Sequence, residues 1–462
     1  MNRYHKLISN SIVFAIGNIG SKMITFLLLP LYTYTLSARA YGIADLVQTT
    51  VSLLLPLISL NIFEGVLRFT MDKSNNKSSV LNIGMRFTMY GSLLFMVLGF
   101  LLSRMSNVSY IGFIVFIVIM QALQSLLSQY VKATGRVTLF AFNGMLLTFV
   151  TAGMDVIFLV FLKLGLLGYF WALIGGLFVS DMYLFWRGQI LASLTLKKVN
   201  KDLEQQMVRF SLPLIPNSIV WWATNAVGRY FVVYFLGATA NGIFAVGNKI
   251  PSMLSVVNSI FFQSWQISAI EEFKSPDRQE FFSNVFRIYS ELMFLGTSLL
   301  IFILKPLMHI IVSDTFFVAW KYIPFLLLSV IYSSFSSFLG QYYVAAKKTS
   351  GVFTTTIYGT LLNVLLNFIL IPKFHLFGAS VASMLSYLVV WIVRAHDVEK
   401  LIQTKYDWRN LIINHFIILL QIVVLFYMQG IFMAIFETIL VLIIFAENIE
   451  IVQVLIGSIR RN

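Results

Sequence analysis

The sequence predicts an all-α integral membrane protein with about 14 transmembrane helices. Hydrophobic residues make up 58% of the 462 residues, charged residues only 11%, and the mean hydropathy is +0.84. A water-soluble domain carries roughly a quarter of charged residues, so most of this chain is expected to lie in lipid. Because each spanning helix takes about 20 residues, the spans use nearly the whole chain and leave no room for a soluble catalytic domain.

Apolar runs between polar or charged residues define the expected spans. In the first half they cover residues 8–35, 42–64, 80–102, 108–131, 138–162 and 165–188. In the second half they cover residues 209–236, 241–268, 284–304, 322–345, 352–371 and 376–396, followed by 411–428 and 431–446. The runs approach the length that crosses the hydrocarbon core. The last two are the least clearly separated, because only Gly430 stands between them.

The longest polar interruption predicts the domain organisation. It runs from Ile190 to Val208, contains Lys197, Lys198 and Lys201, and divides the spans into two groups of six with two more at the end. We expect an N-terminal six-helix lobe at 1–190, a cytoplasmic linker at 191–208, a C-terminal six-helix lobe at 209–400, and two additional helices with a cytoplasmic tail at 401–462.

The distribution of basic residues predicts the orientation. With loops assigned alternately to the two sides and Arg3 and Lys6 placed inside, 24 Lys and Arg residues fall on the cytoplasmic side and 6 on the opposite side. Cytoplasmic loops are enriched in Lys and Arg, so both termini are predicted to be cytoplasmic in a plasma or inner membrane. The first helix is too long for a cleaved signal peptide and is expected to be retained.

An internal repeat relates the two halves. At an offset of 207 residues, the segment from Leu7 to Lys22 has seven identities with the segment from Leu214 to Arg229 in sixteen positions. The ends of the halves also match, because Lys163, Leu166, Gly168 and Ala172 align with Lys373, Leu376, Gly378 and Ala382. Six helices per half place the repeats in parallel topology, an arrangement that occurs in transporters.

Three cations lie within the predicted spans, namely Lys22, Arg229 and Lys249. A charge at the centre of a spanning helix costs roughly 2.5 to 3.5 kcal/mol on insertion scales, so such residues indicate a functional site. Lys22 continues a polar stripe with Ser11 and Asn18, and the repeat carries Ser218, Asn225 and Arg229 in the same register, while Asn248 adjoins Lys249. Two such stripes would line a wet, positively charged cavity. The alternative is that each cation snorkels or pairs with a carboxylate such as Asp45.

Asp155 and Glu291 are the deepest carboxylates in the predicted spans. They are expected either to pair with basic side chains or to bind a coupling proton or sodium ion.

Several activities are not expected. The chain has no Cys, its five His residues form no cluster with ligand spacing, and no phosphate-binding loop motif is present, so neither a metal, a cofactor nor ATP hydrolysis is predicted. The basic residues punctuate apolar runs and form no patch for nucleic acid. A membrane glycosyltransferase needs a sizeable outer loop with catalytic carboxylates, whereas the longest outer loop here, around Lys305 to Lys321, has Asp314 as its only acid.

Three segments carry a resemblance to a known family. They are Asn10 to Leu36, Ser211 to Asn217, and Asn363 to Ala382, which contains Asn363, Asn367 and Pro372. Through them the chain resembles the Wzx-type flippases for repeat units of O-antigen, capsule and exopolysaccharide. These belong to the superfamily that also holds the multidrug exporters and the lipid II flippase.

The resemblance implies a MATE-like fold and a function. It implies that a polyprenyl-diphosphate-linked oligosaccharide is turned from the cytoplasmic to the outer leaflet by alternating access of two lobes. It also implies that Lys22, Arg229 and Lys249 match the family's basic cavity residues on helices 1, 7 and 8, whereas Thr49 departs from a fourth basic position. Membrane lipid, a polysaccharide polymerase and other assembly proteins are the implied partners. The alternatives are a multidrug or organic-cation antiporter, for which Lys22 is the wrong charge, and a lipid II flippase.

Overall fold

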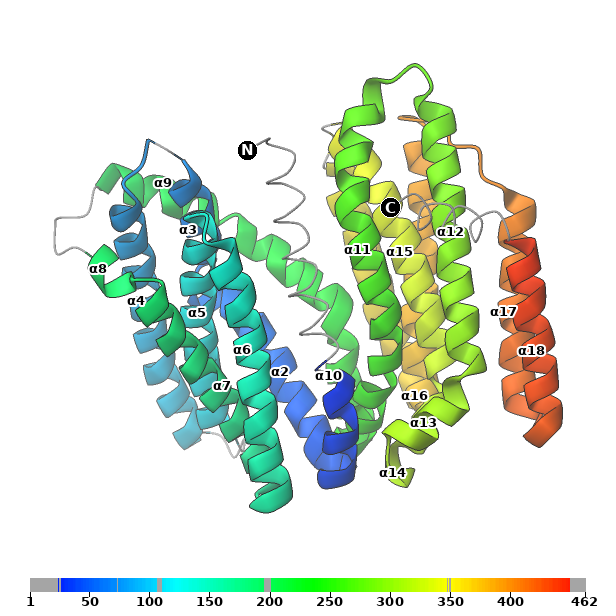
Figure 1. The fold of residues 1–462 in the computed structure, drawn as a ribbon, viewed down its shortest axis with the longest axis horizontal. Helices are drawn as coiled ribbons and strands as arrows, with labels where there is room; N and C mark the ends of the chain where they lie inside the picture. The colour runs from blue at the N-terminus through cyan, green and yellow to red at the C-terminus, as the bar shows by residue number, and fades with distance from the viewer. Residues whose placement is uncertain are drawn as a thin grey trace. The chain divides into compact units, whose positions relative to one another are not determined.

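The computed structural model describes residues 24, 26–72, 74–105, 110–194, 201–346, 348 and 350–448 (Figure 1). The side chains at positions 221, 225, 263, 264 and 267 are outside this description. The chain divides into two compact units, Met1–Ala226 and Val227–Asn462. Throughout the described residues the regular structure is helical, and eleven helices are long and apolar enough to cross a membrane. The predicted fold class is therefore confirmed.

The first unit consists of helices that follow the predicted runs. They are a helix at Phe26–Thr35, α2 (Ala38–Ile58), α3 (Ile62–Met71), α4 (Lys77–Met105), α5 (Ile111–Ala133), α6 (Val137–Asp155), the π-helix η1 (Val156–Phe161), α7 (Gly165–Arg187), α8 (Ile190–Ser193), α9 (Lys201–Ser211) and the start of α10 (Leu214–Gly247).

The run predicted at 42–64 is interrupted in the structure. α2 ends at Ile58, and Leu60 and Asn61 both take left-handed backbone conformations with φ of 50° before α3 begins. The apolar pattern continues through this break, which explains why the run looked continuous. Asn tolerates the left-handed region better than most residues, and here its side chain donates to Ser218 Oγ at 3.0 Å.

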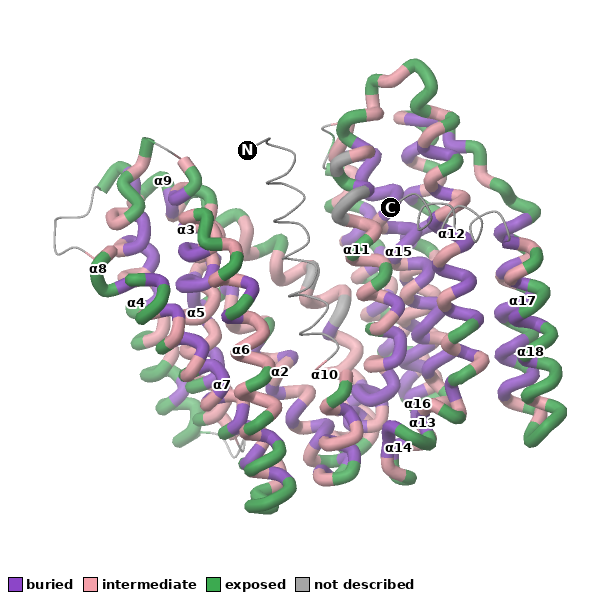
Figure 2. The backbone as a smooth tube through the Cα atoms, viewed as in Figure 1, coloured by how far each residue is buried: buried purple, intermediate pink, exposed green. Residues whose placement is uncertain are grey.

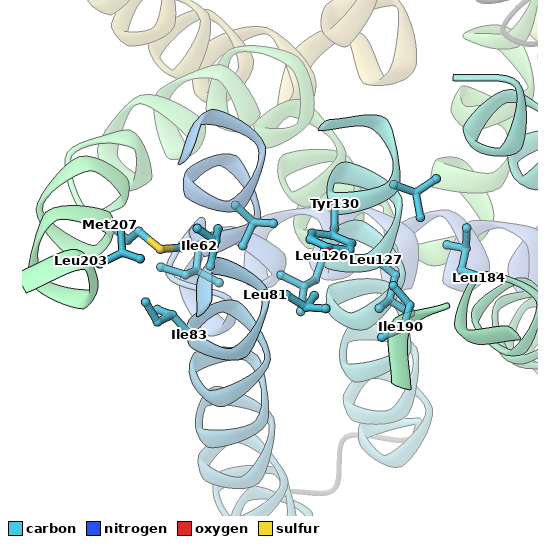
Figure 3. Packing of buried hydrophobic residues seen from close by; sticks show 13 residues of the cluster. Ile62, Leu81, Ile83, Leu126, Leu127, Tyr130, Leu184, Ile190, Leu203 and Met207 are labelled. Carbon is cyan, nitrogen blue, oxygen red and sulfur yellow. The ribbon is translucent and has the colours of Figure 1, made fainter. Parts of the chain in front are cut away.

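The segment predicted as a linker contains a helix that packs on the first unit. Leu203, Met207 and Ser211 lie four residues apart on one face of α9 and are buried. Leu203 and Met207 join a hydrophobic cluster with residues of α3, α4, α5, α7 and α8 (Figure 3). On the same helix, Glu204 accepts from Arg86 of α4 at 3.3 Å. Amphipathic spacing thus fixes α9 along this unit.

The second unit continues from the last part of α10. Its elements are α11 (Lys249–Glu271), η2 (Glu272–Lys274), α12 (Arg278–Phe302), α13 (Leu304–Ile311), α14 (Asp314–Phe317), η3 (Val318–Lys321), α15 (Ile323–Ala345), α16 (Ser350–Val398), α17 (Trp408–Tyr427) and α18 (Gly430–Glu447).

Two of the long elements, α10 and α16, are each divided into two helices by one residue with a non-helical backbone. Gly237 in α10 has φ 85° and ψ 173°, and His375 in α16 has φ 54° and ψ −135°, so each of these elements is two helices. Gly430, with φ 61°, begins α18 and separates it from α17. The predicted boundaries near 236–241, 371–376 and 428–431 are all present.

The core of each unit is built around its fourth spanning helix. In the first unit α5 contacts the interrupted second span, α2 and α3, together with α4, α6 and α7. In the second unit α15 contacts α11, α12 and the two helices of α16, and it is largely buried (Figure 2). The partners correspond one to one under the predicted repeat, so the two halves pack in the same way. The final pair, α17 and α18, packs against α12.

Candidate functional site

The predicted basic and polar residues are only partly described. Lys22, Ser11 and Asn18 lie outside the described residues, and so does the side chain of Asn225, which is part of α10. The polar stripe on the first helix therefore stays a prediction. Arg229, Lys249 and Asn248 are described.

Arg229 and Lys249 lie on two legs of one helical hairpin in the second unit. The chain reverses at Gly237, and residues on both sides of it, including Val232 and Phe244, share one hydrophobic cluster. At about 1.5 Å per residue, Arg229 is ~12 Å from the turn along one leg and Lys249 ~18 Å along the other. Both residues are partly buried. The two cations thus lie within about three turns of the same helical break, one on each leg.

A proline places Lys249 at a helix start. Pro251 has no backbone N–H to donate, and α10 ends one turn before it, at Gly247. Asn248 donates to the carbonyl of Phe244 from both its backbone N–H at 3.0 Å and its Nδ2 at 2.8 Å, and Lys249 is the first residue of α11. The positive end of the helix dipole adds to the charge of Lys249, which favours anions at this point.

An asparagine network lies beside Arg229. The amide of Asn367 is next to Gly228, the residue before Arg229. Its Nδ2 donates to Asn363 O at 2.8 Å and to Asn363 Oδ1 at 2.9 Å, and Asn363 Nδ2 donates to Ser386 Oγ at 3.3 Å. Asn367 is 1% exposed, and its Oδ1 has no hydrogen-bond partner among the described residues. From the sequence, these asparagines were expected only to mark the resemblance to the flippase family. Their spacing of four residues in an apolar run was the signal for a site.

Asp155 forms a buried polar site in the first unit. Its side chain is fully buried, and Tyr32 Oη donates to its Oδ2 at 2.6 Å. Its Oδ1 has no hydrogen-bond partner in the described part of the chain. Tyr169, hydrogen-bonded to Gln48, packs edge-on against Tyr32 at 5.3 Å between ring centroids. The π-helix η1 begins directly after Asp155, and such segments are frequent at functional sites.

Glu291 lies in α12 of the second unit and is 4% exposed. It interacts with neighbouring groups, in keeping with a paired or liganded carboxylate. Asp155 and Glu291 therefore belong to different units. The partners of Asp155, above all Tyr32, were not predicted, because they are more than a hundred residues away in the sequence.

Comparison with solved structures shows what this fold is similar to. The lipid II flippase MurJ, in an inward closed conformation, matches with a TM-score of 0.69 and 12% identity over 97% of this chain and 99% of MurJ. A multidrug resistance MATE transporter of the MOP superfamily, in an inward-facing conformation, matches with a TM-score of 0.67 and 10% identity over 84% of this chain and 98% of that one.

A third structure shares the fold with a different site. It is a MOP superfamily transporter from Pyrococcus furiosus, whose description states that reverse polarity of the binding pocket suggests a different function. It matches with a TM-score of 0.59 and 11% identity over 86% of this chain and 96% of that one. Models of protein families and sequences of curated proteins gave no match. At these identities the likeness establishes an all-α membrane protein with a MATE-like fold.

Proposed function

We propose that this chain is a flippase that turns a polyprenyl-diphosphate-linked oligosaccharide from the cytoplasmic to the outer leaflet by alternating access. The observation that carries the proposal is the pair of cations Arg229 and Lys249, partly buried on the two legs of one apolar helical hairpin. A positively charged site within the span suits an anionic headgroup such as a diphosphate.

The extent of the fold likeness supports a lipid-linked substrate. The match to MurJ covers 97% of the chain and that to the MATE transporter 84%. The MurJ match thus covers 13% more of the 462 residues than the MATE match. This is about the size of the C-terminal segment with α17 and α18. MurJ is described as a lipid II flippase. A lipid II flippase is accordingly the nearest alternative function.

The charge of the site argues against an organic-cation exporter. Such an exporter needs acidic groups in its cavity, whereas Arg229 and Lys249 are basic, and so is Lys22 on the first helix. In the Pyrococcus furiosus transporter, which is similar in fold, the reversed polarity of the binding pocket is described as suggesting a different function.

The diphosphate is proposed to bind Lys22, Arg229 and Lys249, with Ser11, Asn18, Asn225 and Asn248 lining the cavity. A hydrogen bond to a charged group contributes roughly 1.5 to 3 kcal/mol, so Arg229→Ala is expected to weaken binding of the lipid-linked substrate about ten-fold or more. Arg229→Lys keeps the charge without the planar fork and is expected to retain part of the affinity.

Titration of purified protein with a polyprenyl-diphosphate-linked oligosaccharide tests this site. Arg278→Ala is the matched control, because Arg278 is an exposed arginine at the start of α12. It is expected to bind like the wild type. Normal glycan export in cells by the double variant Lys22→Ala, Arg229→Ala at native expression would exclude the site.

Asp155 and Glu291 are proposed to couple transport to an ion. Asp155 Oδ1, which has no hydrogen-bond partner among the described residues, and the contact of Oδ2 with Tyr32 suit a carboxyl that takes up and releases a proton or sodium ion. Flipping in proteoliposomes is measured with a pH gradient, a sodium gradient and a membrane potential imposed separately. Asp155→Asn or Glu291→Gln is expected to lose the response to one of the three. If both variants respond like the wild type to all three, neither residue couples transport.

A further inference from the structure

The last two helices are joined to each other and to α12 by polar side chains. Near the cytoplasmic end predicted for them, Asn410, Asn414 and Asn448 form a buried ring of amide hydrogen bonds between α17 and α18 with distances of 2.8 to 3.1 Å. This layer satisfies its own donors and acceptors. A second polar layer lies further along the pair, and its hydrogen bonds are incomplete.

The second layer contains Glu437 of α18, Gln421 of α17 and Ser298 of α12. Gln421 Nε2 donates to Glu437 Oε2 at 2.9 Å and contacts the backbone carbonyl of Ser298 at 3.4 Å. The three residues are 1%, 0% and 0% exposed. One amide on α17 therefore contacts a side chain of α18 and the backbone of α12 in the interior of the bundle.

Three oxygen atoms in this layer have unfilled hydrogen-bonding capacity. Glu437 Oε1, Gln421 Oε1 and Ser298 Oγ are all buried without a hydrogen-bond partner among the described residues. A buried polar group without a partner costs roughly 1 to 3 kcal/mol, and a buried charge costs more. The three atoms belong to the residues that the Gln421 amide brings into one layer, so a buried carboxyl group and two neutral oxygens there have capacity to bind a cation.

The nearest charged group, Lys305, interacts electrostatically with Glu437, but its hydrogen bonds among the described residues go elsewhere. Lys305 is one turn away, since its Nζ contacts the carbonyl of Leu425 at 2.7 Å and Met433 Sδ at 3.7 Å, and these residues stand four positions from Gln421 and Glu437. Its Nζ also lies 4.3 Å from the ring centroid of Trp320. His415 of α17 bonds Leu411 O, and Glu291 of α12 lies two turns from Ser298. Within the described residues, no ion pair within 4.0 Å involves Glu437.

We propose that Glu437, Gln421 and Ser298 form a binding site for one sodium ion. Hard cations take oxygen ligands, and a single carboxylate with neutral oxygens suits a monovalent ion. A cation of this size holds its oxygens at roughly 2.3 to 2.6 Å, so its ligands surround it and do not hydrogen-bond one another. Glu437 Oε1, Gln421 Oε1 and Ser298 Oγ make no hydrogen bond to one another.

Binding of ²²Na⁺ to the purified full-length protein tests the site. Glu437→Gln is expected to lower the amount of bound sodium by one ion per protein. Glu447→Gln is the matched control, because it removes the same charge from the end of the same helix, and it is expected to bind like the wild type. Equal binding by Glu437→Gln and the wild type would overturn the proposal.

Ser298→Ala keeps the test decisive should Glu437→Gln fail to fold. The Ser298 hydroxyl has no hydrogen-bond partner in the described part of the chain, so a purely structural role predicts no loss on substitution by Ala. If the Ser298 hydroxyl is a sodium ligand, Ser298→Ala is expected to weaken sodium affinity several-fold. The melting temperature without sodium is expected to stay unchanged. A melting temperature that responds to acidification through Glu437 but not to sodium would identify a protonated acid and overturn the assignment.

Discussion

Two buried charges in the spans, Arg394 and Asp181, differ in how their side chains are satisfied. Arg394 is 5% exposed and donates to the hydroxyls of Thr355 and Thr356 and to the carbonyls of Ser336 and Val352. Asp181 is 1% exposed, and neither of its carboxyl oxygens has a hydrogen-bond partner among the described residues. The arginine ties α15 to both helices of α16, whereas the carboxyl group contributes no bond.

Substitutions at these two positions are expected to change stability in opposite directions. Asp181→Asn removes a buried charge without breaking a hydrogen bond, so it is expected to raise the melting temperature of the detergent-purified protein. Arg394→Met leaves several buried acceptors without donors and is expected to lower it, each lost partner costing roughly 1 to 3 kcal/mol. A lower melting temperature for Asp181→Asn would mean that Asp181 holds a partner or ligand.

At the residue scale, the sequence shows which charged residues stand in apolar runs, but it does not show which partners they contact. Lys249 was expected in a span and lies at the start of α11. Arg394 was counted only as a cytoplasmic charge, because it stands near the end of its run, yet it is buried in α16. The contact of Tyr32 with Asp155 joins residues 123 positions apart, and sequence spacing carries no information about such a pair.

At the element scale, helix boundaries follow the residues that can break a helix. Gly237 and Gly430 stand at boundaries between predicted spans, whereas the break near Pro251 falls inside the run predicted at 241–268. The break at Leu60 and Asn61 was missed, because neither residue is a strong breaker and the surrounding run is apolar. The packing face of α9 was also missed, although its buried residues recur every four positions.

The turn at Gly237 is expected to depend on glycine for its backbone alone. Its φ of 85° and ψ of 173° lie in a region that is essentially restricted to glycine, while an added Cβ would meet no atom within 4 Å. Gly237→Ala is therefore expected to lower the free energy of unfolding by roughly 1 to 3 kcal/mol.

Gly247→Ala is the control for this prediction. A Cβ at Gly247 would make ordinary contacts at 3.8 Å, and its φ is not in the left-handed region. Chemical unfolding of the two variants compares them directly. Equal stability of both would show that the turn at Gly237 rearranges at no cost.

At the scale of the whole molecule, the repeat links sequence to packing. The identities between residues 7–22 and 214–229 predicted two equivalent halves. The packing of α5 and α15 on corresponding neighbours agrees with that prediction. The two halves differ in a few charged side chains, which the fold tolerates but does not require. The proposed substrate depends on these side chains. The fold was therefore predicted more completely than the site.

Orientation in the membrane is a further prediction at this scale. The chain has no Cys, so single cysteines can be labelled without background. A cysteine at Asn200 is expected to resist an impermeant thiol reagent in intact cells, while one at the exposed Leu164 is expected to react. Labelling at Asn200 and protection at Leu164 would reverse the assigned orientation.

The most direct test of the proposed function is a flipping assay in proteoliposomes with three substrates. The purified chain is supplied with a polyprenyl-diphosphate-linked oligosaccharide, with lipid II and with a lipophilic organic cation, and each is compared with protein-free vesicles. We predict movement of the lipid-linked oligosaccharide across the bilayer, with loss of most of the rate in Arg229→Ala. Movement of the organic cation alone, or of the oligosaccharide lipid at the same rate in Arg229→Ala as in the wild type, would contradict this account.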